Sequence, residues 1–377
     1  MRVVFDARHL QTVSRTRGIG RYSRNLLGAF ARRAPREIEW TLLTLRGFPR
    51  ADPFQAPAHR VRATWRLRRP ELSMLAIDPL LLSLELAGQG DLYHSVQLGL
   101  PATRRLPAVL TVHDLAPLHW PAHYLATPWS RVGHAWQYAL ARRADAIVAV
   151  SESTKRDVVA RLAIPPERIH VIPEAVDASF APPPREAGAA LARRRFAIPD
   201  RYVLYVGQFD PRKNMDGLLA AFARSAERDR ALRLVIVGTR GKLTRFLEGA
   251  LRRSRAPKDR IIVAGTVDEP MLAALYAGAE CLLHAALLEG FGLTPLESLH
   301  AGTPVIAYRA GAVVEVVGDA GLLADESDPA SLGDALLRYL DDPSLQATLR
   351  ERARARAALF SWDRAADETL ALYRSLT

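Results

Sequence analysis

The sequence is poor in several residue types that would otherwise suggest a class of protein. A single cysteine, Cys281, cannot form an internal disulfide, and its place in the apolar run CLLHAALL predicts a buried structural thiol rather than a catalytic one. This cysteine usage is typical of a reducing, cytosolic environment. The N-terminal stretch MRVVFDARHL has no apolar core of signal-peptide length. The longest apolar segment, residues 72–88, is interrupted by Asp78, Pro79 and Glu85, so we expect no membrane span there.

Lysine is also scarce, with four in 377 residues, and arginine carries most of the positive charge. Residues 1–199 hold 29 Lys and Arg against 16 Asp and Glu, whereas residues 200–377 hold 23 against 24. The basic first half is either a solvated arginine-rich surface or a surface that contacts anionic lipid or a phosphorylated acceptor. Segment 58–75, in which Trp65 lies among five arginines, is the hypothetical membrane contact. We expect no nucleic-acid partner, because no basic motif with interleaved aromatic residues is evident.

What the chain does contain is a repeated alternation of apolar strands and amphipathic helices. Such alternation predicts an α/β protein with parallel sheets covered by helices. The strands expected in the first half are 2–7, 40–45, 60–65, 91–96, 108–115, 146–151 and 168–175, and those in the second half are 201–209, 232–238, 260–267, 281–287 and 304–309.

The alternation lapses at residues 181–199, where three consecutive prolines and a charged patch predict an interdomain linker. We therefore expect an N-terminal domain at 1–180 and a C-terminal domain at 200–360, both doubly wound and Rossmann-like, facing a central cleft. A last amphipathic helix at 361–377, which Ser361 would cap, is expected to cross back to the N-terminal domain.

One stretch, 287-LLEGFGLTPLESLHAGTPVIA-307, predicts a ligand site. An apolar strand ends at Glu289, Gly290 and Gly292 allow a sharp turn, and a helix begins that carries Glu297. Backbone N–H groups at such a helix start attract an anion, whereas the two carboxylates need hydroxyl partners. A ligand with both phosphate and many hydroxyls is a nucleotide sugar.

This stretch and three others resemble the GT-B retaining glycosyltransferases of family 4, in the mannosyltransferase-like branch. The four matching stretches follow in the family's order and are spread from residue 17 to residue 307, which makes them specific as a set. They are 17-RGIGRYSRNLL-27, 111-TVHDLAPLHWP-121, 206-VGQFDPRKNMDGLLAAF-222 and 289-EGFGLTPLE-297 with 302-GTPVIA-307.

The resemblance implies roles for individual residues. Glu289 is similar to the family's carboxylate for donor-sugar hydroxyls, Glu297 to that for the ribose hydroxyls, and Lys213 to the lysine on the diphosphate. The family's usual arginine is replaced by Gln208, for which Arg212 is the expected substitute. His113 is expected near the reacting carbon of the donor, and Asp114 to form an Asx-type turn. The remaining expected contacts of donor or nucleotide are Gly18, Gly20, Gly207, Val267, Phe291, Gly292, Leu293 and Thr294.

Two of these expectations also rest on the residues alone. Lys213 follows the strand VLYVG in a loop that opens a helix, where a cation adds to the field of the helix start on a phosphate. Gly18 and Gly20 lack the third glycine of a dinucleotide fingerprint, so they form either a loop that admits ligand or a structural turn.

The resemblance implies a hexosyltransferase, catalytic through His113, Lys213 and Glu289, that moves mannose from GDP-mannose to a saccharide or lipid-linked acceptor in cell-surface glycan synthesis. We expect no cofactor and no metal, because protein cations can neutralise the diphosphate. We also expect a cytoplasmic enzyme that attaches peripherally to the inner face of the cell membrane. The alternatives are a UDP-sugar-dependent transferase, an epimerase or phosphorylase of the same architecture, or a basic membrane- or nucleic-acid-binding protein.

Overall fold

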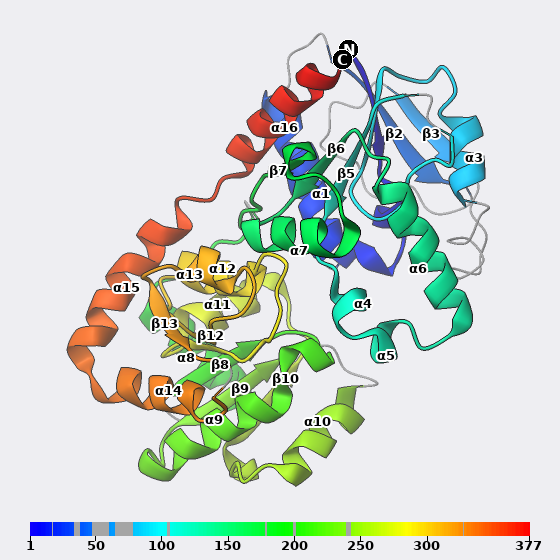
Figure 1. Ribbon diagram of the computed structural model, residues 1–377. Coiled ribbons are helices and arrows are strands. Elements are labelled where there is room, and N and C mark those ends of the chain that lie inside the picture. The colour runs from blue at the N-terminus through cyan, green and yellow to red at the C-terminus, as the bar shows by residue number, and fades with distance from the viewer. Residues whose placement is uncertain are drawn as a thin grey trace. The chain divides into compact units, whose positions relative to one another are not determined.

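The computed structural model describes the chain except residues 17, 34–37, 47–59, 65–77, 104–105, 178, 199–200, 239–242 and 327, and the side chains of 13, 16 and 243–246. The chain forms two compact units (Figure 1). Unit 1 comprises Met1–Glu174 and Ser361–Thr377, and unit 2 comprises Ala175–Phe360. The predicted architecture of two Rossmann-like domains is confirmed.

Unit 1 contains a seven-stranded parallel sheet in the order β3-β2-β1-β4-β5-β6-β7. Its strands are β1 (Arg2–Asp6), β2 (Glu39–Leu45), β3 (Arg60–Thr64), β4 (Leu92–Ser95), β5 (Ala108–Val112), β6 (Ala146–Ala149) and β7 (Ile169–Val171). Its helices are α1 (Gly18–Arg33), α3 (Asp78–Glu85), α4 (Ala116–His119), α5 (Pro121–Tyr124), α6 (Pro128–Ala141), α7 (Glu152–Leu162) and α16 (Trp362–Leu376).

Both faces of this sheet are buried, because successive residues of a strand point to opposite sides. Val4 packs into a cluster with residues of α3, α6 and α7. The next residue, Phe5, meets Phe30 of α1 edge to face on the other side. Phe30 in turn stacks on Trp40 at 4.7 Å between ring centroids.

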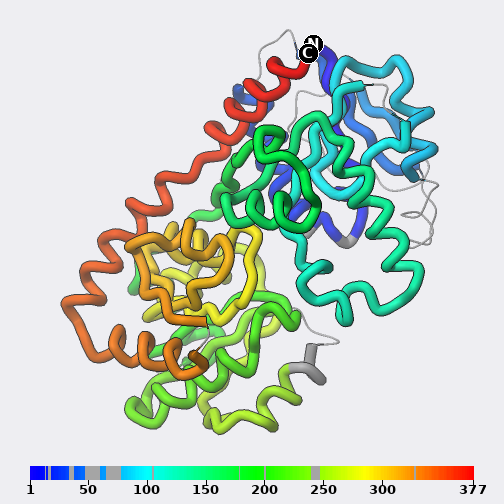
Figure 2. Tube along the Cα trace, in the orientation of Figure 1, coloured from blue at the N-terminus to red at the C-terminus, as the bar shows by residue number. Residues whose placement is uncertain are grey.

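Helix α16 completes this second face, as predicted. Ser361 caps it by accepting from the Arg364 N–H, and it packs against α1. Arg32 and Arg33 at the end of α1 pair with Asp363 and Asp367. Deeper in the unit, the Tyr373 hydroxyl bonds to Nδ1 of His94. The two chain ends consequently lie side by side, with Thr377 in contact with Met1 (Figure 2).

Unit 2 contains a six-stranded parallel sheet in the order β10-β9-β8-β11-β12-β13. Its strands are β8 (Tyr202–Val206), β9 (Arg233–Val237), β10 (Ile261–Gly265), β11 (Leu282–His284), β12 (Val305–Tyr308) and β13 (Gly321–Ala324). Its helices are α8 (Arg185–Phe196), α9 (Met215–Arg228), α10 (Leu243–Arg253), α11 (Glu269–Gly278), α12 (Leu293–His300), α13 (Val313–Val317), α14 (Ser331–Asp341) and α15 (Pro343–Ala357). Cys281 is free and buried in this unit, as predicted.

The expected linker at 181–199 corresponds instead to helix α8, which belongs to unit 2. After the three prolines, the alanine-rich run forms a helix that packs closely on α11. Two glycines permit the approach: a Cβ on Gly188 would lie 2.7 Å from the Ala274 carbonyl oxygen, and one on Gly278 would lie 2.6 Å from the Ala189 nitrogen. Prolines and charge therefore marked the start of a helix here rather than a loose connection.

Candidate functional site

In each sheet the strand order reverses between two neighbouring strands, β1 and β4 in unit 1 and β8 and β11 in unit 2. Ligands of open parallel sheets bind beyond the carboxyl ends of the strands at such a reversal. The loops that follow these four strands are therefore the places to look for a site.

In unit 2, the loops after β8 and β11 are tied together. After β8, Asp210 accepts a hydrogen bond from the Arg212 N–H and holds a short 3-10 turn over Pro211–Lys213. Asn214, at φ +48°, then starts helix α9. Beyond β11, the Leu287 N–H donates to the Arg212 carbonyl at 2.7 Å. This backbone bond brings Lys213 and Glu289 together, although 76 positions separate them in the sequence.

The Glu289 carboxylate lies at the centre of a buried cluster. Lys213 donates to its Oε1, and Arg212 Nη1 donates to its Oε2 at 3.1 Å. Nε2 of His284 lies 3.0 Å from Oε1. Arg212 also donates to the carbonyl of Leu288. Glu289, Lys213 and His284 are 7%, 8% and 1% exposed, so the ion pairs are shielded from solvent.

The cluster fixes the charge of this carboxylate. Burial alone would raise the pKa of Glu289, but Lys213, His284 and Arg212 outweigh burial and hold the pKa well below its ordinary value. Burial lowers the pKa of His284. Burial also lowers the pKa of Lys213, although Glu289 acts in the opposite direction. At neutral pH the site therefore contains an ionised, acceptor-only carboxylate that is hydrogen-bonded to Lys213 and Arg212.

The turn after Glu289 depends on glycine at two positions. Gly292, at φ +104°, precedes the first residue of α12, as the sequence predicted. Gly311, at φ +56°, approaches Glu289 so closely that a Cβ there would lie 2.7 Å from the Glu289 carbonyl oxygen. That carbonyl also accepts from the Ala312 N–H. The loop at 310–312 thus supports the backbone of Glu289, a role that sequence reasoning did not identify.

Glu297 is buried one turn into α12, where its Oε2 accepts a hydrogen bond from the Tyr276 hydroxyl at 2.9 Å. Phe291 is buried against Phe360, with ring centroids 5.7 Å apart. Of the other residues expected here, Gly207 directly follows β8, Val267 lies half-buried between β10 and α11, and Leu293 and Thr294 begin α12. Gln208 is exposed, whereas Arg212 occupies the cluster.

His113, Gly18 and Gly20 belong to unit 1. His113 directly follows β5, and its Nδ1 lies 3.1 Å from Glu174 Oε1 while its Nε2 lies 3.2 Å from the Val96 carbonyl oxygen. The ring also meets Tyr22 edge to face at 4.8 Å. Asp114 accepts from the Ala116 N–H, which confirms the predicted Asx-type turn.

Glu174, which sequence reasoning missed, is 3% exposed, and its Oε2 has no hydrogen-bond partner in the described part of the chain. A buried carboxylate of this kind requires compensation from a ligand or a cation. The sequence signal was available, because Glu174 is an acid directly after the apolar strand IHVIP.

The two glycines before α1 differ from each other. The helix begins at Gly18, earlier than predicted, so it includes both. A Cβ on Gly18 would meet nothing within 4 Å, whereas one on Gly20 would lie 2.4 Å from the carbonyl oxygens of Ser14 and Arg15. Gly20 therefore has a structural reason to be glycine, and Gly18 does not.

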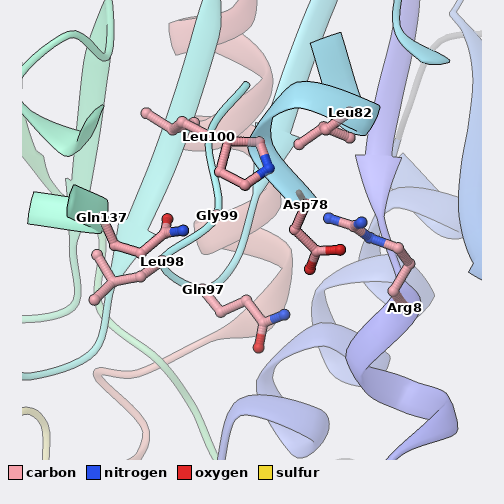
Figure 3. A pocket seen from close by; sticks show the side chains of 9 residues that line it. Arg8, Asp78, Leu82, Gln97, Leu98, Gly99, Leu100 and Gln137 are labelled. Atoms are coloured by element: carbon pink, nitrogen blue, oxygen red, sulfur yellow. The ribbon is translucent and has the colours of Figure 1, made fainter. Parts of the chain in front are cut away.

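Unit 1 has a pocket at its own strand-order reversal (Figure 3). Arg8 follows β1 and its guanidinium donates to both Asp6 oxygens, while Tyr93 of β4 also donates to Asp6. Figure 3 shows the side chains of Arg8 and Asp78 on one side of the pocket and those of Gln137 and Leu98 on the other. The full lining is Arg8, Asp78, Pro79, Leu82, Gln97, Leu98, Gly99, Leu100 and Gln137.

Neither a metal site nor a membrane span is found in the described part of the chain. No group of three His, Cys, Asp or Glu residues there is arranged to hold a metal ion. Among the same residues, no helix is both long and apolar enough to cross a bilayer.

Comparison with known proteins agrees with this architecture. The model of the glycosyl transferases group 1 matches residues 191–356, and that of glycosyltransferase family 4 matches residues 16–180. A D-inositol 3-phosphate glycosyltransferase of Salinispora arenicola is 35% identical over 313 residues, which cover 76% of this chain and 69% of that protein. The O-antigen chain mannosyltransferase B of Escherichia coli is 31% identical over 290 residues, covering 76% of this chain and 74% of that one.

Among solved structures, the sucrose-phosphate synthase of Thermosynechococcus elongatus superposes with a TM-score of 0.77 at 23% identity, covering 100% of this chain and 99% of that one. The fold and the paired strand-order reversals define a GT-B glycosyltransferase. The chain belongs to glycosyltransferase family 4, group 1, and is a hexosyltransferase.

Proposed function

We propose that this enzyme transfers mannose from GDP-mannose, with retention of anomeric configuration, to a saccharide or lipid-linked acceptor in the synthesis of a cell-surface glycan. The observation that carries the proposal is the buried cluster of Glu289, Lys213 and Arg212 at the strand-order reversal of unit 2. This cluster offers an ionised carboxylate for hydroxyls and two cations for a diphosphate.

The donor binds through the hydrogen-bonding capacity of the cluster that its protein partners leave unused. A carboxylate accepts up to about four hydrogen bonds, so Glu289 can receive sugar hydroxyls in addition to its protein donors. Lys213 has three N–H bonds and directs one at Glu289, so the others are available to phosphate oxygens. Glu297 accepts the ribose hydroxyls of the nucleotide beside Tyr276.

The chemistry needs no group that the chain lacks. The bond between the anomeric carbon and the phosphate oxygen breaks, and the acceptor oxygen bonds to the same face of that carbon. The acceptor proton passes to the departing phosphate oxygen. Lys213, Arg212 and the backbone N–H groups at the start of α12 stabilise the charge on that phosphate, each by a few kcal/mol. We therefore propose a reaction without a metal ion, which retains full activity in EDTA.

The acceptor is proposed to bind to unit 1, with the mouth of its small pocket as one of the contacts. Asp6 neutralises Arg8 there, so Asp78 and the amides of Gln97 and Gln137 determine the character of the lining. Such a lining favours hydroxyl groups over a phosphate.

The choice of mannose is supported by the GIGRY stretch and by the name of the Escherichia coli relative, a mannosyltransferase. The competing donor is a UDP-sugar. Thermal unfolding with GDP-mannose, UDP-glucose and UDP-galactose separates the two, because a ligand that binds only the folded state raises Tm. Stabilisation by UDP-sugars alone would reject GDP-mannose, and stabilisation by none would reject the donor site.

Substitution of the cluster tests the site itself. Glu289→Gln should lower kcat/KM at least about 100-fold, because the neutral amide loses the pairing with both cations and the capacity for charged acceptance. Glu248→Gln, on an exposed position of α10, is the matched control and should leave kcat/KM unchanged. NMR of the first-formed product gives its anomeric configuration, and an inverted product would contradict retention.

Incubation with nucleotide sugar alone tests the other enzyme classes. An epimerase would convert the sugar without an acceptor, whereas the proposed transferase at most hydrolyses it slowly. Salt-sensitive binding of DNA without any response to nucleotide sugars would favour the non-enzymatic alternative.

A further inference from the structure

Helix α6 exposes large apolar side chains to solvent. Trp129, Val132 and Trp136 are 59%, 54% and 38% exposed, and their spacing of three and four residues places them along one side of the helix. Other residues of the same helix are already buried in unit 1, namely Gly133, Gln137, Tyr138, Leu140 and Ala141. A helix that is buried over part of its surface and exposes large apolar side chains on the rest offers a site for a second partner.

Neighbouring helix α3 shares this property. Its Leu80 and Leu84 are 53% and 68% exposed. The helices are neighbours, because Pro79 and Leu82 of α3 line the same pocket as Gln137 of α6 (Figure 3). Of the nine exposed large apolar side chains in the described part of the chain, five lie on these two helices. We call Leu80, Leu84, Trp129, Val132 and Trp136 the apolar patch.

The stretch of chain that contains α6 has no acidic residue, whereas neighbouring α3 carries Asp78 and Glu85. Residues 115–144 contain no Asp or Glu, but they contain Arg131, Arg142 and Arg143, all of which are exposed. Arg143 follows Trp136 by seven residues, just beyond the end of the helix at Ala141. Tryptophan and aliphatic side chains flanked by arginine are the combination that binds at the headgroup level of an anionic bilayer.

We propose that the apolar patch, with Arg131, Arg142 and Arg143, docks unit 1 on a membrane surface rich in anionic lipid. The three exposed arginines beside the apolar patch are complementary to anionic headgroups. The aliphatic members, Val132, Leu80 and Leu84, argue for hydrocarbon rather than for a polar polymer. This surface differs from segment 58–75, of which only Arg60–Thr64 lies within the described residues.

Vesicle flotation tests the proposal with the full chain. Wild-type protein should float with vesicles of 70% phosphatidylcholine and 30% phosphatidylglycerol, and its tryptophan fluorescence should shift to the blue as the indoles leave water. The double variant Trp129→Gln/Trp136→Gln should bind at least about tenfold more weakly. Each of Arg131→Gln and Arg143→Gln should weaken binding about fivefold, and added salt should abolish that difference.

Matched controls distinguish binding through this surface from non-specific adsorption to vesicles. Val263→Gln and Leu359→Gln remove exposed apolar side chains of unit 2, 48% and 52% exposed, and should bind as wild type does. Circular dichroism of every variant should match wild type, because the replaced side chains lie at the surface and not in the core.

Four outcomes would overturn the proposal. They are absence of flotation by wild type, equal flotation with pure phosphatidylcholine vesicles, unchanged binding by the tryptophan double variant, and loss of binding through Arg66→Gln/Arg68→Gln/Arg69→Gln alone. A concentration-dependent dimer in solution that the tryptophan variant abolishes would assign the apolar patch to self-association instead.

Discussion

His113 has a hydrogen-bond acceptor beside each ring nitrogen. Glu174 Oε1 lies beside Nδ1 and the Val96 carbonyl oxygen lies beside Nε2, so the ring is held at both nitrogens. The Tyr22 ring limits rotation of the imidazole from a third side. Glu174 is accordingly a positioning residue for His113.

Substitution of Glu174 should reduce turnover more than affinity. We expect Glu174→Gln to lower kcat about tenfold with little change in the KM of the donor, and Glu174→Asp to restore part of the loss. NMR of the imidazole nitrogens should show a changed environment at Nδ1. Glu167→Gln, exposed on the same stretch of chain, is the control. Lower stability with unchanged kcat would assign Glu174 a structural role only.

Asp6 links stability to pH. Burial would raise its pKa, but Arg8 outweighs burial and lowers the pKa from 3.8 to about 2. A carboxyl group with a depressed folded-state pKa stabilises the fold above its unfolded pKa, and that stabilisation is lost as pH falls toward 2. The shift corresponds to about 2 kcal/mol at neutral pH.

The change between pH 5 and pH 3 is therefore predictable. We expect the free energy of unfolding of wild type, measured with urea, to fall by about 1 kcal/mol more than that of Asp6→Asn across this interval. Asp259→Asn, an exposed residue of unit 2, should follow wild type. An equal pH dependence in wild type and Asp6→Asn would contradict the ion pair.

At the scale of elements, helix α1 carries three glycines in different surroundings. A Cβ on Gly20 would collide with the Ser14 and Arg15 carbonyls, one on Gly18 would meet nothing within 4 Å, and one on Gly28 would reach only Arg32 Nη1 at 3.8 Å. Alanine also favours helix over glycine by up to about 1 kcal/mol.

We therefore expect Gly20→Ala to lower the Tm clearly, and Gly28→Ala to keep or raise it. Gly18→Ala should also leave the Tm unchanged. The KM values of this variant for donor and acceptor then show whether the loop at Gly18 admits a ligand or is only a structural turn. A raised KM at unchanged Tm would show that ligand approaches the backbone at Gly18. A stable and active Gly20→Ala variant would contradict the packing described here.

The elements show which parts of the fold the sequence could predict. All twelve expected strands are present, and most of them are apolar runs bounded by turn residues. Strand β13, Gly321–Ala324, escaped prediction because it is a four-residue edge strand that begins with glycine. Helix α8 was mistaken for a linker because its neighbours are prolines and its packing on α11 relies on glycines rather than on an apolar stripe.

The same limit applies to the site. Glu289, Lys213 and Glu297 could be predicted, because a motif and a strand end mark each of them. The pairing of Glu289 with Lys213 could not be predicted, because it depends on the backbone hydrogen bond between Leu287 and Arg212. The contacts of His284 and Tyr276 could not be predicted for a related reason. In the sequence each has the pattern of an ordinary core residue, and each contacts a carboxylate only in the folded chain.

At the scale of the whole molecule, the C-terminal helix α16 contributes to the stability of unit 1. Burial lowers the pKa of His94 to about 3, so its ring is neutral, and Tyr373 of α16 supplies the bond at Nδ1. Tyr373→Phe should destabilise unit 1 by about 1–3 kcal/mol, because it leaves a buried nitrogen without a partner.

A chain that ends at residue 360 should lose the unfolding transition of unit 1 in calorimetry, because α1 and Trp40 would no longer pack against α16.

Tyr276→Phe is the matched control for the loss of a buried tyrosine hydroxyl, because that hydroxyl bonds Glu297 within unit 2. Tyr276→Phe should leave the transition of unit 1 unchanged. A truncated chain that keeps both transitions would show that α16 is dispensable.

The return of α16 also sets the order of events during synthesis. Domains ordinarily fold one after another as they leave the ribosome. Here the first unit to emerge waits for residues 361–377, which are translated only after the whole of unit 2. We therefore expect the aromatic face around Phe30 and Trp40 to stay exposed in the nascent chain until α16 has been translated.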